Sequence, residues 1–459
     1  MAEITPNKEY ADYAPRWKRV RDIDDGEYRL KQNDLACIST TADTGRPSAS
    51  YLRVIKPGDN STYNIGVNRS YINGGRLYNA TARTAKGLLG MAFRVDPTPP
   101  DLPTDLQYLS SNANGAGMDM DQMAKATTDN VIKIGRDGLL CDMPRNEDGS
   151  EVTAQMVADG FRPRMLRYSA ESIVDWHESL INGAMQVDLV VLREVVQEFT
   201  NKLMIERDDV TIYKVYRLTV TGVTVETLKE YEGNFTRDGE AVPVVGANNT
   251  ALKEIPFVFV GSMNNQPCVD GLPIEDIANI NIGHYQESAN LSASAFNVSA
   301  VTPWIADDGY QRAARTAGND DEVELGENSM IILGSGGTFN LAQPDANTMS
   351  QGMMTDYENQ MVALGAQLVT SSSGNETAEA ARIKHSSDVS VLDIIAGNVS
   401  DAYSKMIYYA GLFLGVTISE DLRYELNRNF FDSKLTAQEL DAMIRTWQAG
   451  AISKEVLDK

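Results

Sequence analysis

The side chains best suited to catalysis or metal binding are few in this sequence and lie far apart. None of its three histidines stands in an HxH, HxxxH or HxxEH cluster, the spacings with which histidines share a metal site. None of its three cysteines belongs to a CxxC pair, and their odd number and wide spacing predict buried, reduced thiols. These six residues are His177, His284, His385, Cys37, Cys141 and Cys268. We therefore predict no metal site, unless folding joins a histidine to carboxylates.

Three kinds of short motif resemble functional loops but lack the residues that their chemistry requires. GSGGT at 334–338 resembles a phosphate-cradling turn, yet it lacks the lysine and spacing of a Walker A loop, and no GxGxxG occurs. Ser371–Ser373 have no neighbouring base, and there is no GxSxG elbow. The pairs Asp307–Asp308 and Asp320–Asp321 lack EF-hand spacing. We predict a glycine turn, a flexible loop and solvated acidic loops, with no catalytic residue, metal or cofactor.

The composition indicates a soluble, folded protein with an acidic surface. Apolar residues make up 42% of the 459 residues, and no stretch approaches the roughly 18 consecutive apolar residues that cross a bilayer. Met1–Asn7 carry no secretory signal, so we expect the chain to stay in the cytoplasm where it is made. The net charge of −23 has the wrong sign for gripping DNA phosphates. An acidic surface either maintains solubility or lines a passage for a polyanion, and composition does not decide between them.

The first half of the chain predicts helices followed by a sheet. Small residues in 79–93 predict a closely packed helix, four prolines break the pattern between 96 and 108, and apolar spacing predicts a second helix over 118–140. From about 164 to 261 the pattern becomes β-rich, with turn-forming clusters between the runs. The clearest runs are 187–192, 211–225 and 255–260. We predict a single, mostly antiparallel sheet there.

The next helix is predicted over 273–299, and its face is unusually small and polar. Asn281, Tyr285 and Ser292 lie on that face, where a buried helix normally carries Leu and Val. This pattern favours packing against copies of the chain, or lining a wet space, over burial in a dry core.

The rest of the chain alternates loops with periodic helices. Residues 300–347 are rich in Gly, Asp and Asn and contain one short apolar strand at 330–333. Apolar spacing predicts one helix over 348–368 and a second, starting after the loop VTSSSGNE, that ends near Gly415. That loop is predicted to be flexible, because it has little to bury. Further short helices are predicted from Thr436 onward.

A series of strings along nearly the whole chain carries a resemblance to a known family. In order they are YNATARTAKGLLGMAFR (78–94), RYSAESIVDW (167–176), IPFVFVGSMNN (255–265) leading into LPIEDIANINIGHYQESAN, MVALGAQLV (361–369), ETAEAARI (376–383) with NVSDAY (398–403), and LTAQELDAMIRTWQAGAIS (435–453). In this order they resemble tailed-bacteriophage portal proteins, particularly a portal-like family of phage and prophage genomes known as a domain of unknown function.

The resemblance implies an α+β portal fold. Its parts are a wing of helices and mostly antiparallel sheet, a two-helix stem, a clip, a tunnel loop and a small helical crown. The implied boundaries are wing 1–272 with its sheet at 164–261, first stem helix 273–299, clip 300–347, second stem helix 348–368, tunnel loop 369–376, wing-crossing helix 377–415 and crown 416–459.

The resemblance also implies site residues. The tunnel loop that would contact DNA consists of Thr370, Ser371, Ser372, Ser373, Gly374 and Asn375. The channel-facing residues of the first stem helix would be Asn281, Tyr285, Ser288 and Ser292. An acidic chain and a loop without bulky anchors suit DNA that must slide without sticking.

The implied function is that of a non-enzymatic portal subunit. About twelve copies would form a homo-oligomeric ring at the unique capsid vertex, the channel for double-stranded DNA packaging and ejection. The implied partners are the terminase large subunit, the head-to-tail adaptor or connector, the major capsid and scaffolding proteins, and double-stranded DNA in transient, non-specific contact, with no membrane. The chain would reside in the virion, and in the host cytoplasm during assembly. Motor activity would belong to the terminase, because no nucleotide-binding signature occurs.

Two alternatives remain open at this level. One is another virion structural protein, such as a capsid or tail subunit, whose longest helices would lie outside a central stem and clip. The other is an enzyme whose site forms only on folding, in a pocket that joins a histidine to carboxylates.

Overall fold

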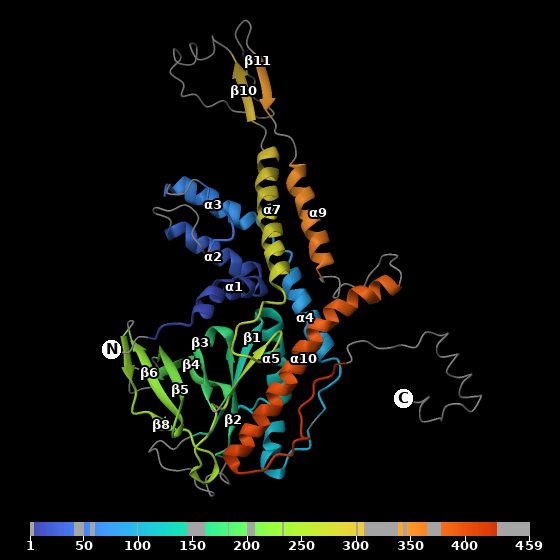
Figure 1. Cartoon of the computed structure of the whole chain (residues 1–459). Coiled ribbons are helices and arrows are strands. Elements are labelled where there is room, and N and C mark those ends of the chain that lie inside the picture. Colours follow the sequence, from blue (N-terminus) through green and yellow to red (C-terminus); the bar gives the residue numbers. More distant parts are fainter. Residues whose placement is uncertain are drawn as a thin grey trace, which may run out of the picture. The chain divides into compact units, whose positions relative to one another are not determined.

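The chain folds into two compact units, each built from segments that are distant in sequence. One unit comprises Met1–Trp17, Ala85–Pro273 and Ser373–Lys459, and the other comprises Lys18–Thr84 and Ile274–Ser372. The computed structural model in Figure 1 describes residues 4–40, 50–55, 60–98, 100–144, 161–181, 183–199, 207–231, 234–299, 302–306, 338–342, 347–364 and 378–428. We call the two units the sheet unit and the helix-pair unit. Helices α1 (Lys8–Asp24) and α4 (Ala80–Ala92) each run from one unit into the other, and α4 confirms the helix predicted over 79–93.

A three-stranded sheet begins the sheet unit. Strand β1 (Arg136–Asp142) lies between β2 (Arg164–Ser169) and β9 (Phe257–Gly261), and both pairings are antiparallel. Helix α5 (Met120–Ile134) precedes β1, with Asp119 capping its first turn. The helix predicted over 118–140 is therefore too long. It ends at Gly135, whose φ of 77° stops the helix in the left-handed conformation that glycine favours.

A second, larger sheet forms a meander. Its strands are β3 (Ile173–Ile181), β4 (Ala184–Phe199), β5 (Arg207–Thr219), β6 (Gly222–Tyr231) and β7 (Asn234–Arg237) in that spatial order, with β8 (Val242–Pro243) also paired to β6. All of these pairings are antiparallel, as predicted. The prediction of a single sheet is wrong, because β2 and β9 pair with β1 instead of joining the meander.

A buried arginine joins the two sheets. The guanidinium of Arg136 on β1 lies 4.2 Å from the ring centroid of Trp176 on β3 and 4.4 Å from that of Phe259 on β9. One of its nitrogens, Nη1, donates to the carbonyl oxygen of Pro267 at 2.7 Å. Burial lowers the pKa of Arg136 to about 10, so the side chain remains charged at neutral pH.

Helix α10 (Ala378–Leu414) completes the described core of the sheet unit. It packs on α5 and β9, and its Tyr403 hydroxyl lies 3.1 Å from the Thr127 hydroxyl of α5. A helix was expected at 377–415, and Gly415 ends it with a φ of 71°. Short 3-10 turns lie at Thr104–Ser110, Ala170–Ser172 (η2) and Ala247–Asn249. The helices predicted from Thr436 lie outside the described residues.

The helix-pair unit is mainly helical. It contains the end of α1, α2 (Glu27–Thr40), α3 (Thr62–Gly74), α7 (Glu275–Ser299) and α9 (Thr348–Ala363). Helix α7 packs against α3 and α9, and Figure 1 shows α7 and α9 side by side. Strands β10 (Thr302–Ala306) and β11 (Thr338–Ala342) pair antiparallel. The strand predicted at 330–333 lies outside the described residues.

Together the helices and antiparallel sheets define an α+β fold, as predicted. In the described part of the chain, no helix is both long and apolar enough to cross a membrane.

Candidate functional site: the α7–α9 helix pair

The polar face of α7 points into its own unit. Asn281 is fully buried, and its side-chain oxygen accepts hydrogen bonds from the backbone N–H of Thr81 at 3.2 Å and from the Thr81 hydroxyl at 3.0 Å. Its Nδ2 donates to the carbonyl oxygen of Tyr78 at 2.6 Å. Asn281 thus holds the first turn of α4 against α7, because it satisfies a backbone N–H that the helix itself leaves unpaired.

Tyr285 and Ser288 follow the same pattern one and two turns further along α7. The Tyr285 ring is buried, and its hydroxyl lies 3.5 Å from Oδ2 of Asp34 on α2. Burial, reinforced by the Asp34 carboxylate, raises the pKa of Tyr285 well above its ordinary value. The Ser288 hydroxyl accepts from the backbone N–H of Arg76 at 2.8 Å and lies within 2.9 Å of the carbonyl oxygen of the same residue. All of these contacts lie within one subunit.

Asp34 is the acidic centre of this buried network. Its Oδ1 accepts hydrogen bonds from the backbone N–H groups of Tyr51 at 2.6 Å and Leu52 at 3.1 Å, and from the Ser50 hydroxyl at 3.1 Å. Burial nevertheless raises the pKa of this carboxyl above its ordinary value, because desolvation outweighs the hydrogen bonds. Tying a loop and two helices to one carboxyl is a structural role.

The prediction that α7 lines a channel is wrong for three of its four residues. Asn281, Tyr285 and Ser288 are buried and hydrogen-bonded inside the subunit, so they do not face a channel. Small and polar residues on one helix face did indicate close approach, but the neighbours are α2, α4 and the turn after α3 rather than another copy. Ser292 is exposed, and its role in a channel stays a prediction.

Glycines set how closely the turn after α3 approaches α7. A Cβ atom on Gly75 would lie 2.8 Å from the ring of Tyr285, and one on Gly74 would lie 2.7 Å from the hydroxyl oxygen of Ser292. Real Cβ atoms do not come this close to another heavy atom, so a side chain at position 75 would force the buried Tyr285 ring to shift. At position 74 the exposed Ser292 hydroxyl can rotate away, so the constraint there is weaker.

Helix α9 packs along α7 through a polar and an apolar contact. His284 of α7 is buried, and its Nε2 lies 3.2 Å from Oε1 of Glu358 on α9. Near the start of α7 and the end of α9, Met361 of α9 is buried against Ile277 of α7. The remaining described surface of α9 is largely exposed, including Met349, which is 75% exposed.

The histidines and cysteines of the described chain do not assemble a chemical centre. His177 is exposed, lies on the sheet unit and hydrogen-bonds Asp188 at 2.7 Å, whereas His284 belongs to the other unit. No group of three potential metal ligands occurs among the described residues, which do not include the side chain of His385. All three cysteines are free, and two are buried as predicted. Cys268 is exposed, so its predicted burial is wrong.

Two predicted functional segments lie outside the described residues. They are the tunnel loop, with Thr370, Ser371, Ser372, Ser373, Gly374 and Asn375, and most of the clip, including GSGGT up to residue 337 and the acidic pairs at 307–308 and 320–321. Their proposed roles stay predictions.

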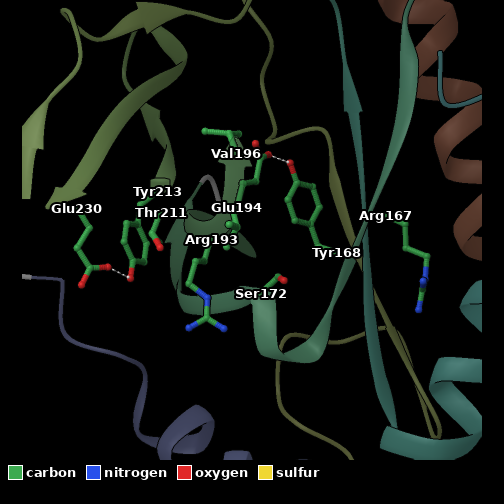
Figure 2. A pocket seen from close by; sticks show the side chains of 10 residues that line it. Arg167, Tyr168, Ser172, Arg193, Glu194, Val196, Thr211, Tyr213 and Glu230 are labelled. Atoms are coloured by element: carbon green, nitrogen blue, oxygen red, sulfur yellow. Dashed lines mark hydrogen bonds between the residues drawn. The ribbon is translucent and has the colours of Figure 1, made fainter. Parts of the chain in front are cut away.

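The sequence did not predict a cleft in the sheet unit. This cleft has a volume of about 490 Å³ and lies beside β4. Figure 2 shows the side chains that line it. Its lining residues are Arg167, Tyr168, Ser172, Arg193, Glu194, Val195, Val196, Thr211, Tyr213 and Glu230. The Tyr168 hydroxyl donates to Glu194, and the Tyr213 hydroxyl donates to Glu230 at 2.8 Å. No histidine or cysteine is among the lining residues that the structure describes.

Comparison with known proteins finds a family match that spans the helix pair and α10. The family model described as Domain of unknown function (DUF4055) matches residues 273–414, from the start of α7 to the end of α10. No curated protein matches the chain.

Solved structures give a weaker likeness over more of the chain. "Neck of empty GTA particle computed with C6 symmetry" is 13% identical with a TM-score of 0.40, covering 93% of this chain and 98% of that one. "Neck of native GTA particle computed with C12 symmetry" is 14% identical with a TM-score of 0.41, covering 92% and 96%. At such values the likeness assigns neither fold nor function to this chain.

Proposed function

We propose that this chain is the portal subunit of a tailed phage or a related particle. It forms the ring at the unique capsid vertex through which double-stranded DNA is packaged and ejected. The observation that carries the proposal is the direct packing of α7 on α9, two helices separated by residues 300–347. This is the arrangement that the sequence resemblance implies for a two-helix stem with a clip between its helices.

The charge of the helix pair supports the same role. Helix α7 contains Glu275, Asp276 and Glu287, helix α9 contains Asp356 and Glu358, and neither contains lysine or arginine. Phosphate contacts repeated around a ring add to a large, salt-dependent grip on DNA. A stem without cations avoids that grip, which suits a passage through which DNA must slide.

The exposure of α9 supports assembly with further copies. Apart from its contact with α7, this helix leaves most of its described surface in solvent, including the apolar side chain of Met349. In a closed ring every subunit has a neighbour on each side, joined head to tail. A neighbouring stem is the surface that would cover Met349.

The proposal assigns the remaining segments as follows. Residues 1–272 form the wing, 300–347 the clip, 369–376 the tunnel loop, 377–415 the wing-crossing helix and 416–459 the crown. The clip docks the terminase large subunit during packaging and the head-to-tail adaptor afterwards, while the major capsid and scaffolding proteins surround the ring. The chain itself is not an enzyme, and it resides in the virion.

The test is the mass and symmetry of the purified full-length protein. We expect native mass spectrometry to give a closed ring of about twelve subunits and negative-stain class averages to show a central hole. A stable monomer at all concentrations, or a compact low-order oligomer with a closed centre, contradicts the proposal.

A further inference from the structure

Strand β4 has a free edge over its second half. Its pairing with β3 starts at Ile173 opposite Leu192, whereas its pairing with β5 continues as far as Phe199 opposite Arg207. Within the described residues, 193–199 are therefore paired on one side only. In an antiparallel ladder roughly half of the residues aim their N–H and C=O groups at each neighbour. About half of residues 193–199 thus have backbone groups that no described strand pairs.

The cleft in Figure 2 runs along this edge. It is lined by four consecutive residues of β4, Arg193 to Val196, whose side chains alternate between the two faces of the sheet. A cavity that touches four consecutive residues reaches the edge of the strand. It also extends over one face of the sheet, where Thr211 and Tyr213 of β5 and Glu230 of β6 line it. Tyr168 of β2 and Ser172 of η2 line it as well.

Two of the four charged residues that line the cleft are paired with an opposite charge. Glu194 lies 2.9 Å from Lys214, and Arg167 lies 2.5 Å from Asp137. The third, Glu230, accepts a hydrogen bond from the Tyr213 hydroxyl at 2.8 Å.

The fourth charged residue, Arg193, is the cation that remains. It donates to the backbone carbonyl of Glu171 at 3.0 Å and makes no ion pair in the part of the chain that the structure describes. A half-buried guanidinium without a carboxylate partner is suited to bind one, because it offers several donors in a fixed planar arrangement.

The neighbour of Arg193 on the same face adds an apolar contact. Val195 lies two residues further along β4 and is 62% exposed. Opposite these two residues on β5 are Tyr213 and Thr211. A strand added to this edge would therefore find a cationic position and, two residues away, an apolar one.

We propose that the edge of β4 from Arg193 to Phe199 binds an extended, acidic segment of another polypeptide, which adds a strand to the sheet. A carboxylate of that segment binds Arg193, and an apolar side chain two residues from it covers Val195. Backbone hydrogen bonds supply affinity and the two side-chain positions supply specificity, as in other cases of β-strand addition. The inference does not depend on the proposed ring, since the edge is present in the single chain.

Synthetic peptides test the charge requirement. The probes are fluorescein-labelled nine-residue peptides of Thr and Val with a central Glu-Thr-Val or Val-Thr-Glu, and matched peptides with Gln in place of Glu. Their binding to the full-length protein is measured by fluorescence anisotropy. We expect one Glu peptide to bind about tenfold more tightly than its Gln counterpart, the difference expected of one charge-assisted contact. R193Q should remove that difference, and R217Q, which changes an exposed arginine of β5 outside the cleft, should not.

N-methylated peptides test strand addition itself. Methylating alternate amides of the tighter peptide removes the donors along one of its two edges. One methylation pattern should abolish binding and the other should leave it within about twofold. V195D should weaken the Glu peptide, and circular dichroism shows whether each variant remains folded.

Three results overturn the inference. They are no binding of any peptide at millimolar concentration, equal affinity for Glu and Gln peptides, and equal sensitivity to both methylation patterns. If the peptides fail to bind while V195D converts an oligomer of the chain to monomers, the edge is a contact between copies and does not bind an acidic segment.

Discussion

Asn281→Ala distinguishes a structural role for the α7 face from a channel-lining role. The substitution removes the acceptor of two hydrogen bonds from Thr81 and the donor to the carbonyl oxygen of Tyr78. Leaving a buried polar group without a partner costs about 1–3 kcal/mol, and the Thr81 hydroxyl can rotate to find another acceptor. We therefore expect a loss of about 2–4 kcal/mol in the free energy of unfolding of the helix-pair unit.

A matched control exists on the same helix. Asn279 is exposed, and its side-chain oxygen accepts from Arg19 at 3.0 Å in an exposed hydrogen bond. Asn279→Ala should change the free energy of unfolding by no more than about 0.5 kcal/mol, because both groups can bond to water instead.

The assay has to resolve the two units, since a chain with two compact units need not unfold in one step. Hydrogen exchange followed by mass spectrometry on peptides from α4 and α7 provides this resolution. Protection there should fall in Asn281→Ala and stay unchanged in Asn279→Ala. Equal protection in both variants would refute the assignment of Asn281 to the interior of the subunit.

Three further substitutions test neighbouring features of the helix-pair unit. Gly75→Ala should destabilise the unit by about 1–3 kcal/mol in urea unfolding, because the added Cβ meets the Tyr285 ring. Gly66→Ala is the control and should not destabilise the unit, because a Cβ at that position meets open space. Burial raises the pKa of the Asp34 carboxyl, so the folded state holds this proton more tightly than the unfolded state and stability is lost as the pH rises through the raised pKa. The wild type therefore carries a loss of stability between about pH 4 and pH 7 that Asp34→Asn lacks. The urea midpoint of the wild type minus that of Asp34→Asn should become smaller over this pH range. An identical pH dependence of the two midpoints would contradict this account. Met349→Asp should reduce the fraction of rings in native mass spectra. It should not lower the unfolding midpoint of the monomer, because Met349 is 75% exposed in the single chain. An unchanged ring fraction would argue against α9 as a subunit contact.

The sequence predicted the elements better than their boundaries and partners. Alternating β-rich runs correctly predicted antiparallel pairing, because the period of two is a local property of a half-buried strand. The helix predicted over 118–140 ran too far, although Lys133 and Gly135 are a recognisable C-terminal signal. The assignment of β2 and β9 to one sheet with β3–β8 failed because both pair with β1, which lies upstream of the β-rich region.

The functional interpretation of α7 shows a different limit. Its face was recognised as small and polar, but the groups that satisfy Asn281 belong to residues 200 or more positions away in the sequence. No local pattern distinguishes an amide that bonds to a distant backbone from one that faces water. The cleft beside β4 was missed for a related reason. Its four β4 residues lie where β4 continues beyond the start of β3, and that difference is set by pairing register rather than by composition.

On the helix pair, neutral polar groups such as Asn281 are buried and charged groups such as Asp356 are exposed, which is consistent with the proposed role. Asn281 and Tyr285 are neutral at physiological pH and turn inward, where hydrogen bonds offset the cost of removing them from water. The carboxylates of Asp276, Asp356 and Glu358 remain exposed, where their ionised forms are solvated. Neutral polar groups thus fix α7 within its unit, while charged groups stay available at the surface. In a channel, the exposed charged groups determine whether the wall binds DNA phosphates, and in these two helices the exposed charged groups include no lysine or arginine.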